Sequence, residues 1–153
     1  MSLREDIENQ YKSSIKDKNA SLTNTLRLIK SAIKDKDIEA RIKGNSDGIL
    51  DQEILGLFQN LVKQRKDSIE AFESAGRKDL IEKEQEEIKI IKSFLPKQKN
   101  ENETEIIIEQ LIKENDFNSL KEMGKLMNLL KDKYSGQIDM GSAGKIAKIK
   151  LSN

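Results

Sequence analysis

The chain has 153 residues and a mass of 17.5 kDa, enough for one domain or two small ones. Charged residues make up 36% and aromatic residues only 4%, with a single proline, and this mixture favours long charged helices over a sheet-rich domain. The chain has no His and no Cys, which excludes His-dependent triads, zincins, zinc fingers, thiol enzymes and disulfide scaffolds. The net charge is only +1, so any surface that binds nucleic acid must be local.

The N-terminal sequence carries no obvious targeting signal. Residues 1–6 lack the hydrophobic stretch of a signal peptide, and no run of about eighteen apolar residues occurs. We therefore expect a soluble, cytoplasmic protein without membrane contact.

Helical periodicity predicts four helices in the N-terminal part of the chain. Ser21 or Thr23 is expected to cap the second helix and Asp51 the third, while Gly76 ends the third and Pro96 stops the fourth. The predicted ranges are roughly 3–18, 23–43, 51–76 and 78–94.

A polar stretch without apolar residues follows Pro96 and indicates a connector between two subdomains. Beyond it, three short helices are expected, with capping-box spacing at Asn102 and Glu105 and at Ser119 and Glu122. Ser142 precedes the last of them. The predicted fold class is all-α, with a four-helix subdomain over 1–96, a connector over 97–103 and a three-helix subdomain over 104–153.

Arg65 falls inside the apolar stripe of the third predicted helix. The apolar stripe of the fourth helix contains Glu84 and Glu87, so an antiparallel hairpin would place Arg65 against one of these carboxylates. A structural ion pair is the favoured interpretation, because unpaired buried charge is costly. The alternative is an arginine held ready for a phosphate or carboxylate ligand.

A basic row lies beside the apolar face of the second predicted helix. Arg27, Lys30, Lys34 and Arg41 fall within about 60° of one another and could follow a phosphate backbone. The alternative is an ordinary solvent face on which acidic residues balance the charge. Those acids are Asp35, Asp37 and Glu39.

The C-terminal segment is a second candidate for phosphate contact. Residues 141–153 contain Lys145, Lys148 and Lys150 and no acid. The alternative is that these lysines only stabilise a helix C-terminus. Aromatic residues are scarce, so contact with an RNA backbone is expected rather than stacking on bases.

Acidic residues are frequent in the fourth predicted helix, but a charge run is usually a solvated face. No phosphate-binding loop or Asp-rich metal loop is present. We expect no catalytic residue, no metal site and no cofactor.

The stretch from Lys63 to Leu80 resembles the signature of the YqeY family. The similarity continues upstream over residues 25–33 and downstream at Lys83-Glu84, Leu95-Pro96 and Met123-Gly124-Lys125. It covers nearly the whole chain.

The resemblance implies an all-helical, two-subdomain protein similar to the C-terminal region of GatB, a component of the glutamine-dependent aminoacyl-tRNA amidotransferase. In that complex the region is a tRNA-recognising tail. The catalytic body with its ATP and magnesium site has no counterpart in this chain. The family label, a carbon–nitrogen ligase with glutamine as amido donor, therefore implies a relationship rather than autonomous catalysis.

The function expected from this resemblance is a bacterial tRNA-binding accessory module. Its expected partners are tRNA and amidotransferase subunits or another protein, and Lys125, Lys145 and Lys148 are the positions nominated to touch tRNA. The alternative is a helical protein-interaction adaptor that neither binds RNA nor catalyses a reaction.

Overall fold

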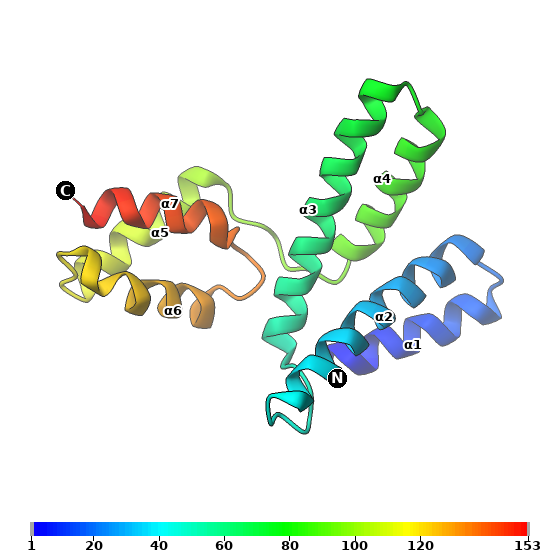
Figure 1. Ribbon diagram of the computed structural model, residues 1–153, viewed down its shortest axis with the longest axis horizontal. Coiled ribbons are helices and arrows are strands. Elements are labelled where there is room, and N and C mark those ends of the chain that lie inside the picture. Colours follow the sequence, from blue (N-terminus) through cyan, green and yellow to red (C-terminus); the bar gives the residue numbers. More distant parts are fainter. Residues whose placement is uncertain (1, 153) are drawn as a thin grey trace. The chain divides into compact units, whose positions relative to one another are not determined.

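The structure is a computed structural model that describes residues 2–152, in which all regular secondary structure is helical (Figure 1). The predicted all-α class is confirmed. The elements are α1 (Leu3–Lys16), α2 (Ala20–Ile42), α3 (Asp51–Ala75), α4 (Lys78–Lys92), α5 (Glu101–Glu114), α6 (Met123–Lys133) and α7 (Met140–Leu151), with one 3₁₀ turn, Leu120–Glu122, before α6.

The chain divides into two compact units, the first ending at Leu95 and the second beginning at Pro96. The first contains α1 to α4 and the second α5 to α7. Helix α5 begins at Glu101, inside the stretch for which the sequence predicts a connector.

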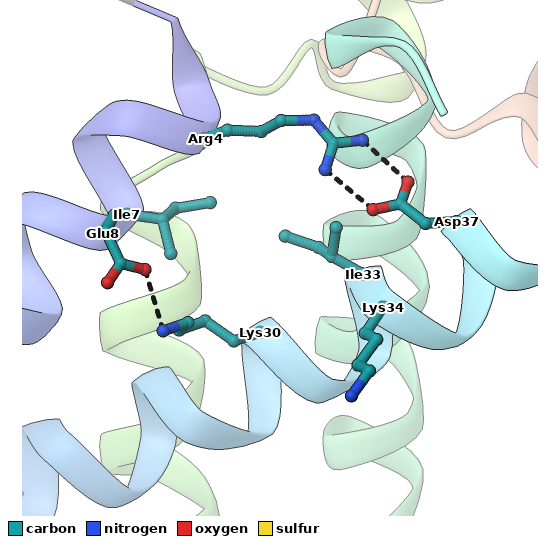
Figure 2. A pocket seen from close by; sticks show the side chains of 7 residues that line it. All are labelled: Arg4, Ile7, Glu8, Lys30, Ile33, Lys34 and Asp37. Atoms are coloured by element: carbon teal, nitrogen blue, oxygen red, sulfur yellow. Dashed lines mark hydrogen bonds and ion pairs between the residues drawn. The ribbon is translucent and has the colours of Figure 1, made fainter. Parts of the chain in front are cut away.

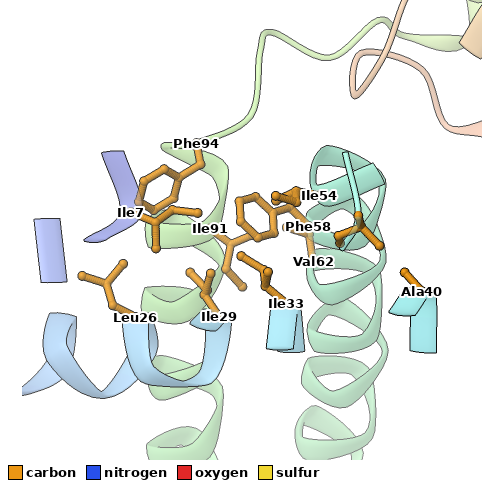
Figure 3. Close-up of a cluster of buried hydrophobic side chains, with 11 residues drawn as sticks. Ile7, Leu26, Ile29, Ile33, Ala40, Ile54, Phe58, Val62, Ile91 and Phe94 are labelled. Carbon is orange, nitrogen blue, oxygen red and sulfur yellow. The ribbon is translucent and has the colours of Figure 1, made fainter. Parts of the chain in front are cut away.

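In the first unit, α1 packs on α2, α3 packs along α4, and α2 contacts both members of the α3–α4 hairpin. All four helices contribute to one core, which Figure 3 shows. Phe58 of α3 is completely buried, and its ring centre lies 5.9 Å from that of Phe94. Ile29 of α2 and Ile91 of α4 are also in this core and are at most 1% exposed.

The α3–α4 hairpin turns at Gly76, which has a left-handed backbone with φ of 70°. Glycine adopts this conformation without a steric penalty, so the predicted helix end at Gly76 is confirmed. The hairpin extends past the α1–α2 pair (Figure 1). Ile69 and Phe72, predicted to face inward, are only half-buried there, because two helices alone cannot enclose them.

Several helix starts differ from the predicted caps. Helix α2 is capped by Asn19, whose side chain accepts from the Leu22 N–H, not by Ser21 or Thr23. Asp51 is the first residue of α3 and not its cap. Its carboxylate accepts a hydrogen bond from the Leu3 N–H at 3.3 Å and so links α3 to the start of α1.

The predicted caps of the second unit are also displaced. The capping box of α5 uses Asn100 and Glu103 instead of Asn102 and Glu105. Ser119 precedes the 3₁₀ turn without a side-chain cap bond. Helix α7 begins at Met140 and is capped by Asp139, so Ser142, which was expected to precede the last helix, lies inside it.

The second unit has its own core, formed between α5, α6 and α7. Leu126 and Leu130 of α6 are completely buried against it. Ala143 and Ala147 of α7 are equally buried, and their small side chains let α7 approach its neighbours closely. This packing leaves the opposite side of α7 exposed, which decides where its lysines point.

Candidate functional site

The hairpin of α3 and α4 contains a nearly buried ion pair. Arg65 Nε donates to Glu87 Oε2 at 2.9 Å, and Arg65 Nη1 donates to the Leu61 carbonyl oxygen at 3.1 Å. The two charged side chains are only 14% and 11% exposed. The structure therefore pairs Arg65 with Glu87, while the other candidate, Glu84, is half-buried outside this pair.

A second charged cluster joins α1, α2 and the loop before α3. Arg4 donates from Nη1 and Nη2 to the two carboxylate oxygens of Asp37 at 2.8 and 2.7 Å. The Ile49 N–H donates to Asp37 Oδ1 at 2.9 Å, and Arg4 Nη2 also donates to the Ile49 carbonyl oxygen at 2.7 Å. The hydrogen bond from Arg4 lowers the pKa of Asp37, although burial opposes this shift.

The prediction that Asp37 lies on the solvent face of α2 is wrong, because Asp37 is only 5% exposed. It follows Ile29 and Ile33 at four-residue spacing and shares their buried face. An acid in register with core residues was the available signal. Its partner could not be identified by periodicity, because Arg4 lies 33 residues away in the sequence.

Gly48 brings the loop between α2 and α3 against this cluster. Its φ is +81°, and a Cβ atom there would collide with Asp37 Oδ1. Only glycine satisfies both the backbone conformation and this close approach.

A hollow of about 170 Å³ lies between α1 and α2. Figure 2 shows Ile7 and Ile33 in the space between two ion pairs, Arg4–Asp37 and Lys30–Glu8. The second pair has a nitrogen–oxygen distance of 2.8 Å, and Lys30 lowers the pKa of Glu8 through their hydrogen bond. The lining residues are Arg4, Ile7, Glu8, Lys30, Ile33, Lys34 and Asp37.

The predicted basic row on α2 is partly engaged by α1. Arg27 Nε donates to the Tyr11 hydroxyl at 3.2 Å, and Lys30 Nζ lies 4.1 Å from the centre of the Tyr11 ring. Lys30 also binds Glu8. Lys34 is exposed and has no hydrogen-bond or ion-pair partner within residues 2–152.

The lysines of the second unit fall into two groups. Lys125 of α6 and Lys145 and Lys148 of α7 are exposed and have no partner in the described part of the chain. Lys150 instead reaches back to α5. Its Nζ lies 3.0 Å from Glu105 Oε1 and 2.7 Å from Glu109 Oε1, and hydrogen bonds to Glu109 and Glu105 raise the pKa of Lys150.

Residues 2–152 contain neither a metal-binding cluster nor a membrane-spanning helix. No group of three or more Asp and Glu side chains in this range is placed to hold a metal ion. No described helix is both long enough and apolar enough to cross a membrane.

Among the lysines and arginines nominated for RNA contact, those without an ion-pair or hydrogen-bond partner are available to bind a phosphate. An ammonium group without an internal partner can contact a phosphate without first breaking an ion pair. In the part of the chain that the structure describes, this condition is met by Lys34, Lys125, Lys145 and Lys148, whereas Arg27 and Lys30 are held by α1.

The sequence matches the family described as Yqey-like protein over residues 4–151. This match covers almost the whole chain and confirms the resemblance seen in the sequence.

The chain is also similar to fungal proteins. A Lachancea thermotolerans protein named Altered inheritance of mitochondria protein 41, mitochondrial, is 42% identical over 82 residues, which are 54% of this chain and 42% of that protein. The Saccharomyces cerevisiae (strain YJM789) protein of the same name is 40% identical over 70 residues, 46% of this chain and 36% of that protein. An uncharacterized Schizosaccharomyces pombe protein is 31% identical over 90 residues, 59% of this chain and 69% of that protein.

The matched region spans less than half the length of the first two relatives. Their names describe mitochondrial proteins and mention neither tRNA nor an amidotransferase. The expected tRNA binding, cytoplasmic location and bacterial origin of this chain therefore stay predictions.

Proposed function

The chain belongs to the Yqey-like protein family, and on that premise we propose that it is a tRNA-binding accessory module related to tRNA-dependent amidotransferases. The observation that supports this proposal is a set of lysines on α6 and α7 that are exposed and have no partner within residues 2–152, namely Lys125, Lys145 and Lys148. We infer the kind of RNA from the resemblance of the Yqey-like family to the tRNA-recognising tail of GatB.

The packing of α7 separates its lysines by role. Ala143 and Ala147 fix which side of the helix faces the core, and Lys145 and Lys148 lie on the opposite side. They are about 4.5 Å apart along the helix axis, so both can reach neighbouring phosphates of one strand. Lys150 is neutralised by two glutamates and is not part of this surface.

Phosphate contact through the side chains also agrees with the start of α7. Asp139 Oδ1 accepts a hydrogen bond from the Gly141 N–H at 3.0 Å, and Asp139 Oδ2 accepts one from the Ser142 hydroxyl at 3.2 Å. A carboxylate therefore occupies the position where a helix N-terminus would otherwise attract a phosphate. The proposed binding is electrostatic and reads the shape of the folded tRNA.

In this proposal the chain supplies binding, and an amidotransferase partner supplies catalysis. We place the module in the cytoplasm, whereas the Lachancea thermotolerans and Saccharomyces cerevisiae relatives are described as mitochondrial. Both compartments contain tRNA, so the proposed binding chemistry is the same in either.

The test is a fluorescence anisotropy titration of labelled tRNA with the full chain at two salt concentrations. Micromolar binding that prefers tRNA over an unrelated double-stranded RNA is expected. The double variant Lys145→Glu, Lys148→Glu should abolish binding at moderate salt, because it removes two phosphate contacts and places two negative charges beside the RNA backbone. Any residual binding should depend less steeply on salt. The matched control is Lys12→Glu with Lys16→Glu on the exposed side of α1.

A helical adaptor is the second candidate. The observation that favours it is the half-buried state of Ile69 and Phe72 where the hairpin extends past the α1–α2 pair. Absence of tRNA binding at low salt, or equal loss in the control double variant, would replace the RNA proposal by this one.

A further inference from the structure

Helix α2 carries a second apolar stripe on the side that faces away from the core. Leu28, Ile38 and Ile42 are 49%, 45% and 82% exposed. At 100° per residue they fall within an arc of about 80°. The core residues of the same helix, such as Ile29 and Ile33, lie on the other side and are nearly completely buried.

The spacing of the exposed stripe is that of a coiled-coil seam. Leu28 and Ile42 are fourteen residues apart, so both can occupy a positions separated by two heptads. Ile38 then occupies the d position of the second heptad. Isolated apolar residues on a surface are ordinary, but three on one seam of one helix form a surface that a second helix can cover.

A row of cations borders this stripe on the side of α1. Arg27, Lys34 and Arg41 repeat every seven residues and are exposed. Arg27 is steadied by the Tyr11 hydroxyl, and Arg41 Nε donates to the Ser46 carbonyl oxygen at 3.3 Å. Their remaining guanidinium N–H groups and the Lys34 ammonium group stay available for a partner.

We propose that this surface, the α2 outer face formed by Leu28, Ile38, Ile42 and the cations Arg27, Lys34 and Arg41, docks an amphipathic helix of a partner protein whose apolar residues are flanked by Asp or Glu. The apolar stripe would pack against the apolar side of such a helix. The cations, spaced seven residues apart, would form ion pairs with its acidic side chains. A phosphate backbone would use the cations but leave the stripe uncovered. The observations therefore favour a protein helix over RNA on this face.

The polar residues within the stripe add a restriction on the partner. Ser31 and Asp35 occupy seam positions between Leu28 and Ile38. A polar seam residue fixes register at some expense of affinity, so the partner helix needs a small or hydrogen-bonding residue opposite them. Binding is accordingly expected to be moderate and specific in register.

The probe is a fluorescein-labelled, N-acetylated peptide of three heptads. It has Leu at the seam positions that face Leu28, Ile38 and Ile42, Asn at those that face Ser31 and Asp35, and Glu at the flanking positions. A second peptide with Lys in place of every Glu is the control. The full chain should bind the Glu peptide with micromolar affinity and at least about tenfold more tightly than the Lys peptide. Equal affinity for both peptides, or no binding of the Glu peptide, overturns the proposal.

Variants assign the binding to this face. Ile42→Asp should weaken binding of the Glu peptide at least about fivefold, since it places a charge in the seam. Ile106→Asp on α5 is the matched control, because Ile106 is a similarly exposed isoleucine at 62% exposure. Unchanged peptide binding by Ile42→Asp contradicts the assignment.

A tRNA titration of a further variant, Lys34→Glu, tests the competing occupant, a phosphate backbone. If Lys34→Glu lowers tRNA affinity and its salt slope while Ile42→Asp leaves peptide binding intact, the α2 outer face is a phosphate-binding surface and the proposal fails. The proposed tRNA function depends on Lys145 and Lys148 of the second unit, so its failure is recognised separately.

Discussion

The carboxylate of Asp37 holds α1 and the loop before α3 to α2 through one side chain. It accepts hydrogen bonds from Arg4 and from the Ile49 N–H, and it is 5% exposed. Because Arg4 lowers the pKa of Asp37, the folded protein binds this proton less tightly than the unfolded chain. The stability from this carboxylate is therefore present above the ordinary Asp pKa of about 4 and is lost as the pH falls through the lowered value.

Asp37→Asn should remove this acid-sensitive part of the stability. Near pH 7 the variant is expected to lose about 2 kcal/mol, since the charge-assisted bonds to Arg4 are gone. Thermal unfolding between pH 2 and 7 measures both effects. Asp35→Asn, an exposed change on the same helix, is the control and should shift stability by less than about 0.5 kcal/mol. A pH profile of Asp37→Asn parallel to the parent would contradict the assigned role.

Arg65→Ala should destabilise the chain by about 3 kcal/mol, because it leaves the Glu87 carboxylate largely buried without its partner. Chemical denaturation measures the loss. The double variant Arg65→Met, Glu87→Leu removes both charges and should recover most of it. A change within about 0.5 kcal/mol for Arg65→Ala would show that solvent already screens this pair.

At the scale of elements, periodicity and glycine positions are sufficient to predict the helices but not their first residues. The sequence Asn100-Glu101-Asn102-Glu103-Thr104-Glu105 offers two capping boxes offset by two residues. The structure uses the earlier one, which buries Thr104 to 3% exposure while its hydroxyl donates to the Asn100 carbonyl oxygen at 2.8 Å. That choice depends on packing within the second unit, which capping spacing does not encode.

The loop between α2 and α3 offers a matched pair of glycine substitutions. Both Gly44 and Gly48 have positive φ, but a Cβ at Gly44 meets nothing within 4 Å, whereas one at Gly48 collides with Asp37. Gly44→Ala should cost only backbone strain, about 1 kcal/mol, and Gly48→Ala at least about 2 kcal/mol more. Urea denaturation of both variants measures the difference. Equal losses would mean that Asp37 moves aside freely.

At the scale of the whole molecule, the sequence was sufficient to predict which cations lie on the surface, but not which of them form ion pairs. Lys30 and Lys34 lie one turn apart on α2, yet only Lys30 is held by Glu8 of α1. Lys148 and Lys150 are two residues apart, yet only Lys150 is held by α5. Each distinction depends on a carboxylate brought in by another helix, so it follows from tertiary packing and not from spacing along one helix.

Each of the two units has a hydrophobic core drawn only from its own residues, so we expect each to unfold by itself. Phe58→Ala should destabilise the first unit by about 3–5 kcal/mol, and Leu130→Ala the second by about 2–5 kcal/mol, because both side chains are completely buried. Native-state hydrogen exchange measured amide by amide separates the two. Faster exchange confined to the substituted unit is the expected result, whereas acceleration across both units would show that the chain unfolds as one cooperative body.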